Sequence, residues 1–173
     1  MNPGLYGCLI GALVLGVGIA AWTPKQETAP HLWPTVVGLG GLIVGLLVVG
    51  LVSGTVSRHL IQVAPAAGVL ALVLGGSPYG RAAALPVVTF WGGLMAVIWL
   101  FLLDLHQLIA GHFTGVEIGL TVGIAATCFV GLRGGARPTA NLSRGRRVIT
   151  AAIGSVLQLA AFWASMQPFA FLS

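Results

Sequence analysis

The sequence predicts an all-α, polytopic transmembrane helical bundle that forms a single integral membrane domain over residues 1–173. Of these residues, 57% are hydrophobic and only 6% are charged, and the mean hydropathy is +1.02. Ordinary soluble domains carry about 25% charged residues. The apolar residues also gather in stretches close to the roughly 20 residues that a helix needs to cross a bilayer. Lipid is therefore the expected solvent for most of the surface.

The N-terminal part of the chain predicts a helical hairpin. The first span covers 5–22 and ends at Trp22, where an indole suits the membrane interface. The second span covers 33–53 and opens with Pro34, which a first helical turn tolerates because the missing N–H would have no partner there. The start of the chain lacks a basic region and a clear cleavage site, so we expect the first segment to be retained.

The next apolar segment, 60–75, is ambiguous. It is short and contains Gln62 and Pro65, so it is either an additional span or a re-entrant or interfacial segment. Its shortness and its central proline favour five full spans, with six as the alternative. Counting basic residues does not separate the two, because each arrangement puts seven of them inside and one outside. Five spans put the N-terminus inside and the C-terminus outside.

The C-terminal half predicts three clear spans, which cover 84–103, 114–132 and 148–166. The stretch that follows the first of these spans contains Asp104, His106, His112 and Glu117 but no Lys or Arg. The last two are separated by a basic stretch that contains Arg133, Arg137, Arg144, Arg146 and Arg147. Lys and Arg near a span resist translocation, so the loop 133–147 is expected in the cytoplasm, with the polar loop and the C-terminus outside.

The formal net charge of +5 does not predict a nucleic-acid-binding surface. Most of it comes from the single arginine stretch, and no soluble basic face is available to lie along phosphates. Membrane lipids with anionic headgroups, or a partner subunit, fit this charge better.

Motifs of soluble enzymes are absent from the sequence. It has no phosphate loop, HExxH, nucleophile elbow, dinucleotide fingerprint or CxxC motif, so neither an enzyme nor a cofactor site is expected. The three carboxylates, on Glu27, Asp104 and Glu117, lie outside the span centres. Since an intramembrane charge usually marks a transport pathway, the chain alone is not expected to be a proton pump, an ion channel or a carrier core. Cys8 and Cys128 are expected to be small packing residues.

Two interpretations remain for each of the polar residues near the span 114–132. Glu117 is favoured as an acid at a helix N-terminus, where it interacts with the first N–H groups, and contact with an ion or substrate is the alternative. His106 and His112 are favoured as interface residues. Haem or metal ligation is the alternative, but their spacing supplies no third ligand.

Small residues recur every four positions in the span 114–132. They are Gly115, Gly119, Gly123, Thr127 and Gly131. This spacing predicts a continuous stripe on one helix face, along which another backbone can approach closely. Packing within the bundle is favoured, and docking to another subunit is the alternative.

Short motifs within and beside the spans resemble those of a known family. In the first hairpin they are Ala21-Trp22 and Leu32-Trp33-Pro34. In the C-terminal half they are Ala125-Ala126-Thr127, Arg146-Arg147 and Phe162-Trp163. With these motifs the chain resembles the small membrane subunit, often called TctB, of bacterial tripartite tricarboxylate transporters. The chain departs from the family between His59 and Arg81, where an additional apolar segment takes the place of a polar linker.

The resemblance implies a small accessory transmembrane subunit of a secondary carboxylate transporter in the bacterial inner membrane. Its partners would be a larger membrane transport subunit and a periplasmic substrate-binding protein. Two alternatives remain. One is an accessory subunit of another membrane complex, respiratory or photosynthetic. The other is a haem-binding oxidoreductase module that uses His106 or His112.

Overall fold

The computed structural model describes residues 3–22, 32–107, 109, 112–136 and 142–167, which contain six α-helices and no strand. The helices are α1 (Pro3–Trp22), α2 (Trp33–Val52), α3 (Val56–Leu74), α4 (Pro78–Leu102), α5 (Gly115–Gly135) and α6 (Arg144–Ser165). Each of them is long and apolar enough to cross a membrane. The predicted all-α transmembrane bundle is therefore confirmed.

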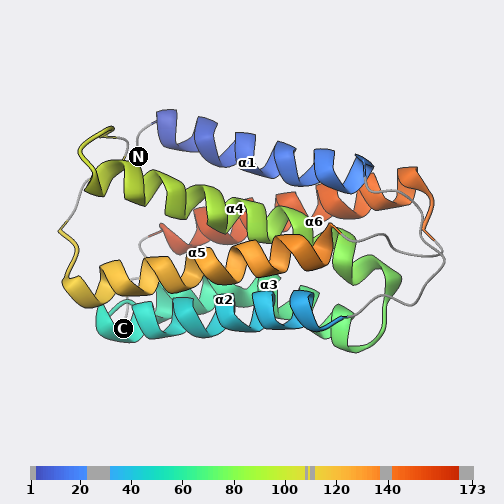
Figure 1. Ribbon diagram of the computed structural model, residues 1–173, viewed down its shortest axis with the longest axis horizontal. Helices are drawn as coiled ribbons and strands as arrows, with labels where there is room; N and C mark the ends of the chain where they lie inside the picture. The colour runs from blue at the N-terminus through green and yellow to red at the C-terminus, as the bar shows by residue number, and fades with distance from the viewer. Residues whose placement is uncertain (1–2, 23–31, 108, 110–111, 137–141, 168–173) are drawn as a thin grey trace.

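The helices run up and down along the long axis of the bundle (Figure 1). The first turn of α1, the last turn of α6 and the α4–α5 connection lie together at what we call the polar end, which carries Asp104 and His106. The α3–α4 turn and the start of α6 lie at the opposite, basic end, which carries Arg144 and Arg146. Both ends of the described chain therefore lie at the same end of the bundle.

The ambiguous segment forms a complete helix, α3. It begins at Val56, four residues before the expected start, and Pro65 lies inside it. Proline removes one helical hydrogen bond, but packing against neighbouring helices lets a membrane helix continue through it. α3 packs against α2, α4 and α6. The structure thus supports six spans instead of the favoured five, so that the start of α1 and the end of α6 lie at the same end of the bundle.

Three helix ends are closed by residues in the left-handed backbone region. Gly54 has φ +66°, Gly76 has φ +70°, and Asp104 has φ 57°. One backbone bond spans each turn, from Thr55 N–H to Gly50 O (2.8 Å), from Ser77 N–H to Leu72 O (2.9 Å) and from Leu105 N–H to Leu100 O (2.9 Å). These bonds satisfy carbonyls that a helix end otherwise leaves without partners, and Gly or Asp tolerates the backbone conformation. Asp104 therefore terminates α4.

α2 and α5 form the most extensive helix pair in the bundle. A Cβ added to Gly38 would overlap the backbone of Gly131. A Cβ added to Gly41 would lie 2.5 Å from Thr127 Cγ2. Small residues on both helices thus allow the two backbones to come close, as is common where membrane helices pack.

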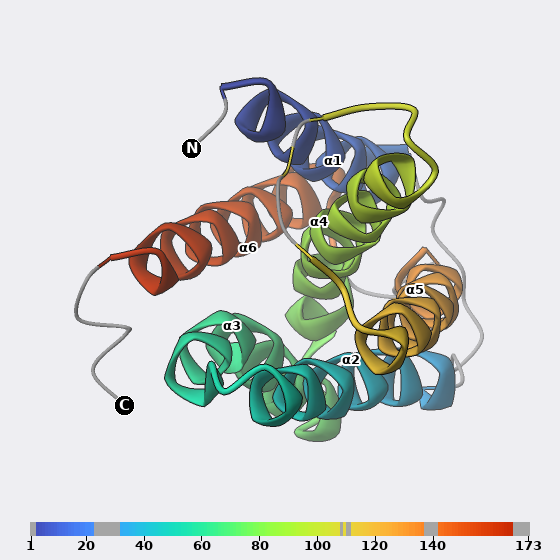
Figure 2. The same ribbon diagram turned by 90° about the vertical axis from the view of Figure 1, so that its left-hand side faces the viewer.

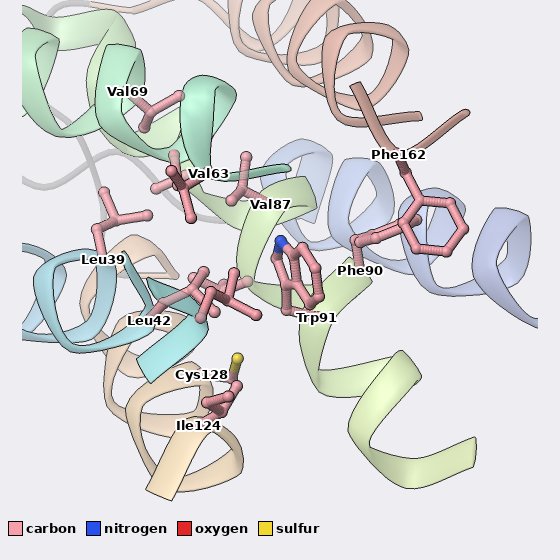
Figure 3. Close-up of a cluster of buried hydrophobic side chains, with 14 of the residues drawn as sticks. Leu39, Leu42, Val63, Val69, Val87, Phe90, Trp91, Ile124, Cys128 and Phe162 are labelled. Carbon is pink, nitrogen blue, oxygen red and sulfur yellow. The ribbon is translucent and has the colours of Figure 1, made fainter. Parts of the chain in front are cut away.

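α4 is the central helix, since it packs against each of the other five described helices. Its Phe90 ring meets Trp91 edge-on with 5.6 Å between centroids, and it meets Phe162 of α6 at 5.2 Å. Figure 3 shows these rings among buried side chains from α2, α3 and α5. Trp91 and Phe162 of this cluster also line the cavity described below.

Candidate functional site

The small-residue stripe of α5 is divided between two environments. Gly115, Gly119 and Gly123 are exposed, and a Cβ added to any of them would meet nothing within 4 Å. Thr127 contacts Gly41, and Gly131 is buried against Gly38. Four residues advance a helix by slightly more than one turn, so a strict four-residue repeat drifts by about 40° at each step. The spacing predicts a single continuous face, and the structure corrects this prediction. The stripe has an open half, Gly115 to Gly123, and a packed half, Thr127 to Gly131.

The side chain of Glu117 caps the start of α5 through hydrogen bonds. Its Oε2 accepts hydrogen bonds from the backbone N–H and the hydroxyl of Thr114, both at 2.8 Å. The N–H of Glu117 donates in return to Thr114 Oγ1 at 3.3 Å. This reciprocal pair is a capping box, which satisfies backbone donors that a helix start leaves without partners.

A cavity of about 670 Å³ lies at the polar end of the bundle. All six described helices and the α4–α5 connection contribute to its lining, and Figure 2 looks onto this end. The side chains that matter for its chemistry are Arg58, His59, Gln62, Trp91, Leu94, Met95, Gln107, Glu117, Thr121, Ile124, Phe162 and Met166. Its lining combines polar and apolar side chains, whereas the lining of a second hollow between α1 and α6 is almost wholly apolar.

The polar wall of the cavity comes from the first two turns of α3. Arg58 Nη2 donates to Met166 Sδ at 2.8 Å, and the buried amide of Gln62 donates to Ser165 Oγ at 2.9 Å. His59 Nδ1 lies 3.0 Å from the carbonyl oxygen of Thr55. These contacts tie the start of α3 to the end of α6 and hold the three polar side chains at the cavity.

The floor of the cavity is apolar. Trp91, Ile124 and Phe162 are each at most 3% exposed. The indole N–H of Trp91 has no hydrogen-bond partner among the described residues, although a buried indole usually finds one. In Figure 3 this nitrogen is directed toward the α3 side of the cluster, near Val63 and Val87. The cavity thus changes from polar at α3 to apolar at α4 and α6.

The arginines of the basic end differ in exposure. Arg133, Arg144 and Arg146 are exposed, and Arg137 lies outside the described residues. Arg147 is buried, because α6 begins at Arg144 and its fourth residue faces the bundle. The guanidinium of Arg133 lies 4.4 Å from the centre of the Phe129 ring. The exposed arginines can meet lipid phosphates, whereas Arg147 belongs to the interior of the bundle.

The structure does not gather the other candidate residues into a site. His106 and His112 are exposed, and no group of three metal-ligating side chains occurs within the part of the chain that the structure describes. Cys128 is buried, as a packing residue should be, whereas Cys8 is exposed on α1.

The sequence analysis missed the polar wall of the cavity. Arg58, His59 and Gln62 follow the spacing i, i+1 and i+4, which places them on one helix face once the segment is recognised as a helix. Only Gln62 lies within the expected segment 60–75, where its polarity weighs against a span, and Arg58 and His59 precede that segment.

Comparison with protein-family models, curated proteins and solved structures found no match to the chain.

Proposed function

We propose that the chain is a small accessory transmembrane subunit that docks to a larger membrane subunit through the open half of α5. The observation that carries this proposal is the exposure of Gly119 and Gly123, with no atom within 4 Å of an added Cβ. Glycine inside a helix is less favourable than alanine by roughly 0.5–1 kcal/mol. Packing inside this bundle accounts for Gly131 but not for these two glycines.

A second helix is the occupant that suits this face best. In lipid, helices associate through close van der Waals packing, and small residues four apart allow the backbones to approach. On either side of Gly119, α5 exposes Val116 and Val122 at 61% and 51%. A glycine face bordered by larger apolar side chains can receive a partner helix.

The transport role is proposed on the resemblance to the tripartite tricarboxylate transporters. Within the described helices the one carboxylate is that of Glu117, and the capping box at the helix start engages it. This arrangement supports a larger subunit as the carrier of carboxylate and coupling ion, fed by a periplasmic binding protein. In that assembly the basic end faces the cytoplasm of the bacterial inner membrane, following the positive-inside rule.

The docking face is tested by filling it. Gly119→Leu combined with Gly123→Leu should abolish co-purification of a larger membrane protein, because the side chains would hold the partner backbone away. The measurement is affinity purification of the tagged chain from its native membrane, with mass spectrometry of what accompanies it. A respiratory or photosynthetic partner in the wild-type sample would replace the transporter assignment while keeping the docking face.

The matched control is Gly68→Leu on α3, an exposed glycine that also has nothing within 4 Å of an added Cβ. It should retain the partner, and the double variant should keep the wild-type melting temperature. Equal recovery of the partner with the double variant would refute docking through α5.

A further inference from the structure

We infer that the cavity at the polar end binds an amphipathic carboxylate, a molecule with one carboxylate head and a long apolar body. This site lies between the helices and is formed by the single chain, so it stands apart from the docking proposed for α5. Its size supports a ligand, since about 670 Å³ falls within the roughly 300–1,000 Å³ of small-molecule sites.

The distribution of polarity indicates an amphipathic occupant. Arg58, His59 and Gln62 line one wall, whereas the floor is made of buried side chains such as Trp91 and Phe162. A small, fully hydrated solute would leave the apolar floor unfilled. A purely apolar molecule would remove water from the polar wall without replacing the lost hydrogen bonds. A molecule with one polar end satisfies both parts.

The charge of the lining indicates an anionic head. Among the lining residues the basic one is Arg58 and the acidic one is Glu117. The Glu117 carboxylate accepts hydrogen bonds from Thr114 on α5, and Arg58 lies on α3 next to His59 and one turn before Gln62. A planar guanidinium matches a planar carboxylate through two parallel hydrogen bonds. A guanidinium has five N–H donors, so Arg58 can bind a carboxylate in addition to its existing partners, and Met166 Sδ is a weak acceptor among these.

The position of the cavity suits a ligand that partitions into the membrane. Arg58 lies in the first turn of α3, where a charged head stays close to the headgroup region. The apolar floor lies deeper in the bundle, along α4 and α6. A long-chain fatty acid held in this way keeps its carboxylate near water and its chain between helices.

The inference is tested by competition binding on the full chain in nanodiscs of zwitterionic phospholipid. The probe is cis-parinaric acid, whose fluorescence rises in an apolar site, and the competitors are oleate and methyl oleate. Oleate should displace the probe at about tenfold lower concentration than the ester, because only the acid forms a charge-assisted bond with Arg58. Displacement by the zwitterionic lipid of the disc would instead reveal a lipid site without charge selection.

Two variants locate the head and the body of the ligand. Arg58→Gln should weaken the binding of oleate by about tenfold and leave the binding of methyl oleate unchanged. Leu94→Trp, which narrows the apolar part of the cavity, should weaken both. Arg144→Gln, at the exposed basic end, is the matched control and should alter neither.

Failure of the probe to bind the wild-type chain would overturn the inference. So would equal displacement by acid and ester, or unchanged binding of oleate to Arg58→Gln with a wild-type melting temperature. None of these results depends on a partner subunit, so they leave the docking face on α5 to its own test.

Discussion

Replacing Gly38 by leucine should destabilise the bundle by about 3 kcal/mol or more, at the upper end of what overpacking costs. Even the first carbon of the new side chain would overlap the backbone of Gly131, which cannot rotate away as a flexible side chain can. α2 and α5 would have to separate along the most extensive helix contact of the fold. The measurement is thermal unfolding of the purified chain in detergent, followed by size-exclusion chromatography.

Gly40→Leu provides the matched control, since it lies on the same helix two residues away and a Cβ added there would meet nothing within 4 Å. Its melting temperature should stay close to that of the wild type. If Gly38→Leu and Gly40→Leu lowered the melting temperature equally, the altered lipid contact of a larger side chain on α2 would explain the effect, and the close α2–α5 packing would not.

Cysteine labelling should show that α3 crosses the membrane. Ser53 precedes α3 and Ser77 follows it, so six spans put the two residues on opposite sides. In intact cells, a membrane-impermeant maleimide should label Ser53→Cys fully and Ser77→Cys only after permeabilisation. The exposed native thiol of Cys8 is first removed as Cys8→Ser, whereas the buried Cys128 can stay.

Two reference positions calibrate the labelling. His106→Cys at the polar end should react in intact cells, and Arg144→Cys at the basic end should not. With five spans, Ser53→Cys and Ser77→Cys would both be protected. Protection of both would restore the re-entrant or interfacial interpretation of this segment.

Much of the fold could be predicted because apolar length is a local property of the sequence. Hydropathy places the spans around Trp22 and Trp33 where α1 and α2 lie, and it places the span around Trp99 within α4, which begins at Pro78, six residues before the expected start at 84. α3 was harder, since Pro65 and Gln62 lower its hydropathy, and its helix survives because α2, α4 and α6 pack around it. Those contacts are tertiary and leave no local signal.

The site could be predicted only in part, for two physical reasons. The four-residue spacing identified Gly119 and Gly123 as members of a small-residue stripe. The rotation of the helix along that stripe decides which of its glycines stay open. The cavity joins Arg58 on α3 with Met166 beyond the end of α6, residues 108 positions apart, so no local pattern could reveal it.

Photo-crosslinking in native membranes tests most directly whether α5 docks to a larger membrane subunit. A photoreactive amino acid replaces Gly119 in one sample and Gly68 in the other, since both glycines are exposed. We expect position 119 to give an adduct containing one larger membrane protein, identified by mass spectrometry, and position 68 to give none. Adducts at position 119 with lipid alone, or with a second copy of this chain, would contradict this docking.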